Sequence, residues 1–202
     1  MSLIIEVKIN AVNNLSDARY CAGMGVNMLG FCVDPNSDSQ IDLKKINAII
    51  QWVSGVSIVF EFDTVNQEIF DIVSQEIQPD YIEVCTIENW ESIIGLGVSV
   101  IHRIDALQNK SYKETAKDSP ASYLLIEGLN ENEILVQAEF FNRLSESKKI
   151  LLAGNINAQN IERIIEIAKP WGIAITGGEE EKPGYKTFDE MADLLEKLEQ
   201  EA

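Results

Sequence analysis

Three features that define other classes of protein are missing from this sequence. No apolar run approaches the eighteen or so residues that a membrane-spanning helix needs, so no membrane partner is expected. No charged leader followed by an apolar stretch precedes the first predicted strand, and we therefore expect a cytoplasmic protein. Positive charge is scarce, because 33 acidic residues against 16 basic ones give a net charge of −17. Such a surface repels phosphate, which argues against nucleic acid as a partner but leaves room for a local cationic pocket.

Cysteine and histidine are scarce as well. Cys21, Cys32 and Cys85 form no close pair and no metal-binding spacing, so reduced thiols are expected. His102 is the single histidine. The sequence therefore predicts neither a bound metal nor an organic cofactor.

What is present is typical of one soluble globular protein. Apolar residues make up 46% and charged residues 24% of the chain, and 202 residues are enough to build one large core. No low-complexity segment and no linker-like stretch interrupts the sequence. We therefore predict a single domain over residues 1–202.

Strand and helix patterns alternate from the beginning of the sequence. Leu3–Ile9 is short, rich in β-branched residues and almost continuously apolar, as a strand buried in a parallel sheet should be. Ser16–Asp17 is the expected N-cap of the first helix, Gly25 its expected end, and 26–33 the next strand. Further strands are expected at 57–62, 80–85, 98–103, 121–127, 149–153 and 171–176. Helices are expected at 43–52, from 63 onward, and at 89–96, 108–119, 132–144, 157–169 and 187–199.

Eight such alternations in a chain of this length predict an α/β protein, a (β/α)8 TIM barrel. A doubly wound open sheet is the alternative, because the pattern does not show closure. In both folds the ligand site lies at the carboxyl ends of the strands. The residues expected there are Lys8, Asn10, Asp34, Glu61, Glu83, Cys85, His102, Glu127, Gly154, Asn155, Thr176, Gly177 and Gly178. A metal cluster of Asp34, Glu61 and Glu83 is conceivable, but no ligand spacing marks it.

Stretches near both ends of the chain carry a specific order of motifs. Val7–Ala18 begins Val-Lys-Ile-Asn-Ala-Val and ends Leu-Ser-Asp-Ala, and Gly25–Phe31 reads Gly-Val-Asn-Met-Leu-Gly-Phe. Leu152–Asn160 begins Leu-Ala-Gly-Asn, and Thr176–Lys186 begins Thr-Gly-Gly-Glu and ends Pro-Gly-Tyr-Lys. In this order the motifs resemble those of the phosphoribosylanthranilate isomerase family, the barrel enzymes of tryptophan biosynthesis. The likeness spans nearly the whole chain.

The resemblance implies an Amadori rearrangement of N-(5-phosphoribosyl)anthranilate. In that reaction a general acid opens the ribose ring, and a general base takes a proton from the adjacent sugar carbon. The family's base is the cysteine of Lys-Ile-Cys-Gly, and Asn10 stands at that position here. The family's acid is an aspartate that ends the sixth strand, and Glu127 matches it. A carboxamide has no useful basicity, so the inherited base is absent.

Other positions of the family differ too. The arginine of the loop after the second strand is Ser39, and the glycine-rich loop after the sixth strand is 128–132. The Gln-Leu-His of the fourth strand is Glu83-Val-Cys85, and an aspartate of the eighth strand is Ala174. Most chemical positions have changed while the scaffold motifs remain, which is hard to reconcile with unchanged chemistry.

Part of an anion site is retained. Gly154 and Asn155 follow the seventh strand and Thr176–Gly178 the eighth, where backbone N–H groups can hold a phosphate. The alternative is that the glycines only form tight turns. Lys8 matches the family's inward lysine and is expected to contact a ligand or support the site. The implied partner is a small phosphorylated sugar or other anionic metabolite, bound by a monomer or a homodimer.

Four residues are candidates for a replacement acid or base. If Glu83 and Glu127 both point into the mouth, each carboxylate raises the pKa of the other, and one can act as the acid and the other as the base. The alternative is that both are solvated carboxylates at the rim. Cys85 shares the strand parity of Glu83 and is a candidate base, or else a small buried apolar residue. His102 is either catalytic or packed and neutral.

Two hypotheses follow from these residues. The first is an isomerase of a phosphorylated sugar, with Glu127 as the acid and a replacement base. The second is a non-catalytic paralogue that binds a small anionic metabolite or a protein partner. The absent base favours the second hypothesis for the original reaction.

Overall fold

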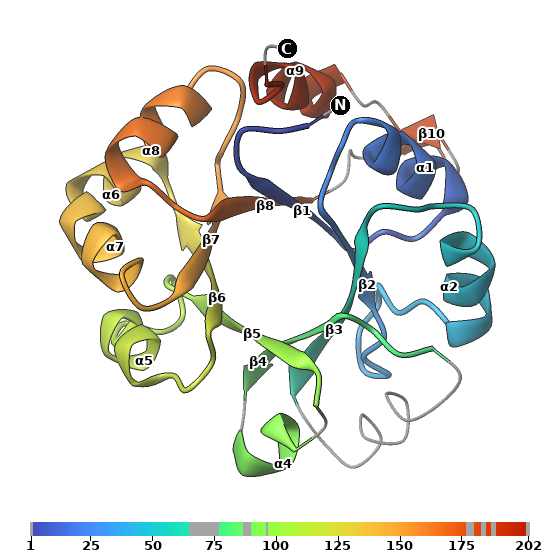
Figure 1. Cartoon of the computed structure of the whole chain (residues 1–202), viewed down its shortest axis with the longest axis horizontal. Coiled ribbons are helices and arrows are strands. Elements are labelled where there is room, and N and C mark those ends of the chain that lie inside the picture. The colour runs from blue at the N-terminus through green and yellow to red at the C-terminus, as the bar shows by residue number, and fades with distance from the viewer. Residues whose placement is uncertain are drawn as a thin grey trace.

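Eight parallel strands form a closed barrel in the computed structural model, which describes residues 2–64, 77–86, 90–95, 97–176, 180–182, 185–186 and 189–200 (Figure 1). Each strand pairs with the next, and β8 pairs with β1, so the predicted (β/α)8 barrel is confirmed and the open sheet is wrong. The strands are β1 Glu6–Asn10, β2 Met28–Cys32, β3 Ser57–Thr64, β4 Tyr81–Thr86, β5 Ser99–Asp105, β6 Tyr123–Leu129, β7 Lys149–Gly154 and β8 Gly172–Thr176.

Helices surround the barrel on its outer side (Figure 1). They are α1 Leu15–Gly23, α2 Leu43–Ile50, α4 Trp90–Ile94, α5 Tyr112–Asp118, α6 Glu131–Val136, α7 Ala138–Leu144, α8 Ile161–Ala168 and α9 Asp189–Lys197. A short antiparallel pair, β9 Glu180–Lys182 and β10 Tyr185–Lys186, was not expected. None of the described helices is both long and apolar enough to cross a membrane.

Several predicted helix boundaries are wrong. The N-cap of α1 is Asn14, whose side chain accepts a hydrogen bond from the Asp17 N–H, and not Ser16–Asp17. The single helix expected over 132–144 is two helices, since the backbone of Gln137 leaves the helical conformation between α6 and α7. The helix expected from 63 onward starts too early, because β3 continues to Thr64, and its remainder lies outside the described residues.

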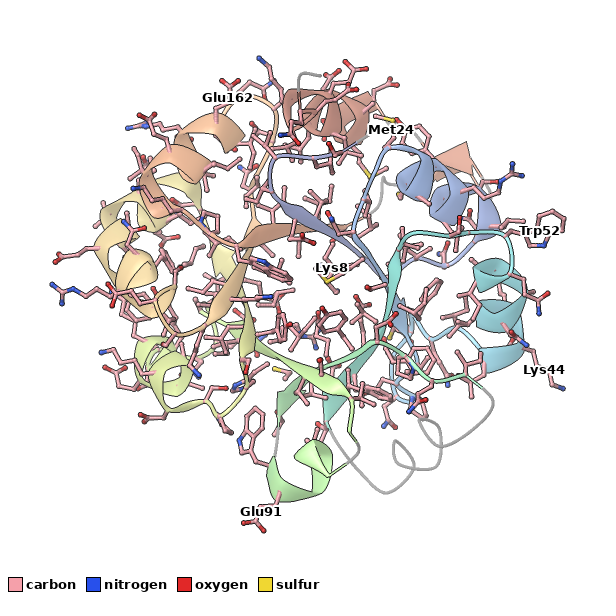
Figure 2. All side chains as sticks on the ribbon, viewed as in Figure 1. Lys8, Met24, Lys44, Trp52, Glu91 and Glu162 are labelled. Carbon is pink, nitrogen blue, oxygen red and sulfur yellow. The ribbon has the colours of Figure 1, made fainter. Side chains whose placement is uncertain are left out.

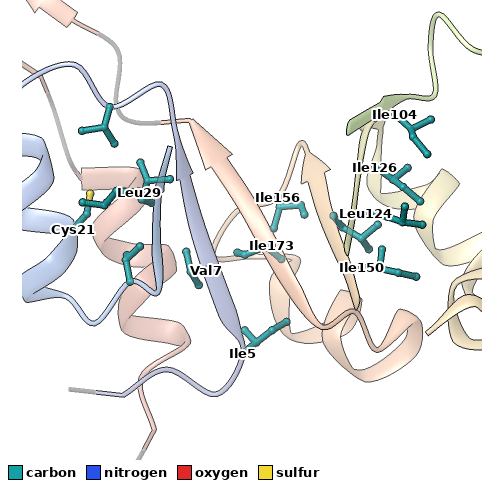
Figure 3. Close-up of a cluster of buried hydrophobic side chains, with 14 of the residues drawn as sticks. Ile5, Val7, Cys21, Leu29, Ile104, Leu124, Ile126, Ile150, Ile156 and Ile173 are labelled. Atoms are coloured by element: carbon teal, nitrogen blue, oxygen red, sulfur yellow. The ribbon is translucent and has the colours of Figure 1, made fainter. Parts of the chain in front are cut away.

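The barrel separates two apolar clusters, because successive strand residues point to opposite faces. The larger cluster lies between the strands and the helices and includes Val7, Leu29 and Ile173 (Figure 3). The smaller cluster fills the barrel interior, with Ile101, Leu125 and other apolar residues packed against Tyr81, Tyr123 and Trp171. On β1, β3, β5, β6 and β8 the inward face continues, at the carboxyl end, into polar residues that border the mouth.

Candidate active site at the barrel mouth

A buried lysine occupies the centre of the barrel (Figure 2). Lys8 on β1 is fully buried, forms an ion pair with Glu61 on β3, and has its Nζ 2.9 Å from Glu83 Oε2 on β4. The ammonium also donates a hydrogen bond to Asn10 Oδ1, at 2.5 Å. Burial lowers the pKa of Lys8, but the carboxylates of Glu61 and Glu83 outweigh it and the pKa is raised. Lys8 therefore stays protonated, and its ammonium group is bound by the side chains of Glu61, Glu83 and Asn10.

Asn10 is held in place by this cation and by the backbone that follows it. Its Oδ1 is tied to Lys8, and its side chain borders a cavity at the barrel mouth. Ala11 adopts a left-handed conformation with φ of 51°, and its N–H donates to Glu61 Oε2 at 3.0 Å. The ion pair thus fixes both the side chain of Asn10 and the turn that begins the loop after β1.

Arg103 also lies at the mouth, although the sequence pattern did not single it out. It follows His102 on β5, points into the barrel and forms an ion pair with Asp63 on β3. Its NH1 lies 3.7 Å from Glu83 Oε1, and its Nε lies 3.7 Å from Glu127 Oε1. Burial lowers the pKa of the guanidinium, yet the three carboxylates raise it above its ordinary value. The strict alternation of inward and outward residues along 99–105 was the signal for this arginine.

Glu127 lies on the inward face of β6, with about a third of its side chain exposed, 34%. Burial is the main cause that raises its pKa, while Arg103 lowers it, and Glu83 and Asp105 raise it further, so the net shift is upward. The expected influence of Glu83 on Glu127 is therefore present, although Arg103 lies between the two carboxylates. A carboxyl group with a raised pKa keeps its proton to higher pH, which suits a general acid.

Two cavities open at this mouth and share Asp105 and Glu127. The first, of about 530 Å³, is bordered by Asn10 and by the ends of β6, β7 and β8, including Gly154, Asn155 and Thr176. The second, of about 610 Å³, lies over β3, β4 and β5 and is bordered by Cys85 and Arg103. Cys85 is half-buried there. Asn10, Cys85, Arg103 and Glu127 therefore surround one divided mouth.

His102 lies on the helix side of β5 and is not part of the Lys8 cluster. Its Nδ1 lies 2.9 Å from Ser119 Oγ, and its ring packs edge-on against Trp90 of α4 with the centroids 5.1 Å apart. Burial lowers the pKa of His102 to about 4, although a hydrogen bond to the Cys85 backbone opposes the shift. This is the packed, neutral state that the sequence left open, even though the residue also borders the second cavity.

The expected anion-binding residues are placed only in part. Gly154, Asn155 and Thr176 are exposed at the mouth, and the Asn160 amide holds the loop by donating to the Asn155 carbonyl at 2.8 Å. Gly177 and Gly178 lie outside the described residues. The described residues that border the first cavity include three acids, Asp105, Glu127 and Glu190, and no lysine or arginine. Phosphate binding here stays a prediction that depends on backbone N–H groups.

The conceivable metal cluster does not assemble. Asp34 accepts backbone hydrogen bonds from Asn36 and Asp63, at 2.8 and 2.9 Å, and so fixes the loop after β2. Glu61 and Glu83 are instead occupied by Lys8. Within the described ranges, no group of three or more His, Cys, Asp or Glu side chains is arranged to hold a metal ion.

The fold and the site define a (β/α)8-barrel protein with a polar, ionisable mouth at the carboxyl ends of its strands. A model of the family "N-(5'phosphoribosyl)anthranilate (PRA) isomerase" matches residues 7–197. The chain therefore belongs to the phosphoribosylanthranilate isomerase family.

Curated relatives carry the same family name, and solved structures share the fold. The chain is 23% identical to the N-(5'-phosphoribosyl)anthranilate isomerase of Aquifex aeolicus, over 98% of this chain and 100% of that protein. It is 26% identical to the isomerase of Maridesulfovibrio salexigens, over 95% and 96%. A phosphoribosyl anthranilate isomerase solved with reduced 1-(o-carboxyphenylamino)-1-deoxyribulose 5-phosphate has the same fold, with a TM-score of 0.79, 20% identity and coverage of 96% and 98%. The Thermus thermophilus enzyme gives a TM-score of 0.76 at 24% identity, with the same coverage.

Proposed function

We propose that this protein binds a small sugar-derived metabolite at the barrel mouth and does not carry out the rearrangement of its family. The observation that carries the proposal is the environment of Asn10. A carboxamide stands where the resemblance places the proton-abstracting cysteine, and its oxygen accepts a hydrogen bond from Lys8 at 2.5 Å. An amide oxygen that is held by an ammonium group cannot accept a proton from carbon at neutral pH.

Of the two proton transfers in the family's reaction, the one that needs a general acid still has a suitable group here. Glu127 matches the family's acid, borders the same cavity as Asn10 and has a pKa raised chiefly by burial. In this proposal Glu127 donates a proton to a bound sugar, while no group at position 10 completes the second proton transfer. The result is a binding protein whose site still stabilises the early part of the reaction.

The ligand of a solved relative gives a concrete probe. That relative was solved with reduced 1-(o-carboxyphenylamino)-1-deoxyribulose 5-phosphate. We expect this compound to bind the wild-type protein in isothermal titration calorimetry. If the compound does not bind, the proposed ligand class is wrong.

Turnover is tested separately with freshly prepared phosphoribosylanthranilate, whose fluorescence decays as it rearranges. We expect the wild-type protein and Asn10→Ala to leave the spontaneous rate unchanged. Asn10→Cys should create measurable turnover, because the adjacent Lys8 ammonium favours a thiolate. Adding Glu127→Asp and Ser39→Arg should increase it, since both restore the family's residues.

One outcome of the turnover assay would contradict the proposal. Clear wild-type turnover that survives Asn10→Ala means that another base has replaced the cysteine, and Asp105→Asn and Cys85→Ala would then identify it. Both residues border the mouth beside Glu127. No turnover in the triple variant, with binding intact, would leave the proposal standing and would mean that the loss of activity extends beyond these three positions.

A further inference from the structure

Arg103 carries the only positive charge among the described residues that border the two cavities. Lys8 is the nearest alternative, but its side chain is fully buried and bound to Glu61, Glu83 and Asn10. The side chain of Arg103, in contrast, is 21% exposed. A negatively charged group that enters the mouth therefore meets one described cation, and that cation is a guanidinium.

Not every N–H donor of Arg103 has a hydrogen-bond partner among the described residues. Its Nε is buried and has no hydrogen-bond partner within the described part of the chain. Glu83 and Glu127 lie 3.7 Å from NH1 and Nε, which is too far for a hydrogen bond. The remaining contact, to Asp63, involves a carboxylate whose side chain is 70% exposed. Water screens such a pair, so a ligand can displace it at little cost.

The geometry of a guanidinium selects the group that would replace Asp63. Nε–H and an NH2 group of arginine form a planar fork that matches the two oxygens of a carboxylate. A carboxylate docked on this edge would satisfy the unpartnered Nε and take over the bond now made to Asp63. It would lie beside Glu127, which is the candidate proton donor.

The position of Arg103 also sets the direction of the ligand. The guanidinium reaches from β5 towards Asp63 on β3, whose N–H donates to Asp34 at the end of β2. Gly154 and Thr176, on β7 and β8, lie on the opposite part of the closed barrel. A ligand held by its carboxylate at Arg103 would therefore pass Glu127 and extend towards β7 and β8.

From this arrangement we infer that Arg103 is the specificity-determining residue of the mouth and selects ligands that carry a carboxylate on the side facing β3–β5. The inference rests on the proposed function, since it names the feature of the small metabolite that this site recognises. It assigns the carboxylate contact to a residue inside the barrel wall and not to the loop after β2, where Ser39 is exposed.

The test compares two ligands that differ only in the carboxylate. Calorimetry would measure the affinity of reduced 1-(o-carboxyphenylamino)-1-deoxyribulose 5-phosphate and of its phenylamino counterpart, which lacks the carboxyl group. Wild-type protein should prefer the first by about tenfold or more, as expected for a charged bidentate hydrogen bond. Arg103→Met should abolish the preference and leave affinity for the phenylamino compound within about twofold.

Two further variants keep the test decisive. Arg143→Met removes an arginine that is 75% exposed on α7 and should change neither affinity. Arg103→Lys keeps the positive charge beside Glu83 but lacks the fork, so the preference should fall even if Arg103→Met does not fold. Thermal melting would establish that each variant is folded.

Each outcome bears on a distinct claim. A wild-type protein that binds both ligands equally, or an Arg103→Lys variant with an unchanged preference, overturns the role of Arg103 and leaves the proposed function standing. Equal loss of both ligands in a folded Arg103→Met variant also overturns it, because the arginine would then support the site and not read the carboxylate. If neither compound binds the wild-type protein, the proposed function fails, and this inference with it.

Discussion

Gly30 on β2 and Glu61 on β3 approach each other so closely that no side chain fits between them. A Cβ atom at Gly30 would overlap the carboxylate of Glu61 and would lie 2.9 Å from Lys8 Nζ. The buried ion pair of Lys8 and Glu61 therefore occupies the space that a side chain on β2 would otherwise fill.

The first prediction tests this close approach. Gly30→Ala should lower the free energy of unfolding by about 1–3 kcal/mol, because the new methyl group has to displace a buried ion pair. Gly23→Ala is the matched control. A Cβ at Gly23, on the exposed end of α1, meets nothing within 4 Å. That variant should gain about 0.5–1 kcal/mol from helix propensity. Urea unfolding measures both values, and equal stability of the two variants would contradict the close approach.

A second prediction concerns the charge of Lys8. Lys8→Met should destabilise the protein by about 3–5 kcal/mol, because Glu61 and Glu83 would remain buried without their cation. The double variant Lys8→Met/Glu61→Gln should recover part of this loss. Lys197→Met is the control, since Lys197 is 51% exposed and its pairing with Glu162 is loose, at 3.8 Å. A Lys8→Met variant as stable as this control would show that the pair contributes little.

A third prediction follows from the buried His102. Its pKa is about 4 in the folded protein and 6.5 as its ordinary value, so between these values the unfolded chain binds more protons. Stability should therefore be fully present above about pH 6.5 and decrease as the pH falls towards 4. The loss by about pH 5 should be on the order of 2 kcal/mol. The free energy of unfolding would be measured above pH 6.5 and at about pH 5. It should change less with pH in His102→Gln than in the wild-type protein, and an equal change in both proteins would contradict this account.

Ala11 provides a fourth prediction. Its φ of 51° lies in the left-handed region, where a Cβ atom is unfavourable and glycine is not. Ala11→Gly should stabilise the protein by up to about 1 kcal/mol, after allowing for the greater freedom of glycine in the unfolded chain. Ala18→Gly in α1, where Ala18 is buried, should do the opposite. Thermal unfolding distinguishes the two, and destabilisation by Ala11→Gly would show that the turn is not strained.

The sequence was most informative about the barrel and least informative about contacts between distant strands. Apolar runs predicted the eight strands to within a few residues, because buried parallel strands depend on local composition. Closure depends on the pairing of β8 with β1, and these two strands are far apart in the sequence. Local patterns do not contain that information.

The site shows the same division. Lys8, Glu83 and Glu127 were expected at the carboxyl ends of strands. The direct contact of Lys8 with Glu83, and the position of Arg103 between Glu83 and Glu127, could not be predicted from the pattern. His102 was singled out for its chemical type, although its neighbour Arg103 is the residue on the inward face. At this position, the alternation of inward and outward residues along the strand predicts which side chain faces the mouth better than side-chain chemistry does.

The seam between β1 and β8 also constrains how the chain can assemble. β1 pairs with β8 over five residues, from Glu6 opposite Gly172 to Asn10 opposite Thr176, but with β2 over only Lys8–Met28 and Ile9–Leu29. During synthesis, most of the inter-strand hydrogen bonds of β1 can therefore form only after β8 has emerged from the ribosome. Until then the growing sheet has an unpaired parallel edge, which is the part of a nascent protein most exposed to wrong pairing. For this protein, the pairing of β8, the last strand of the barrel, decides whether β1 is protected.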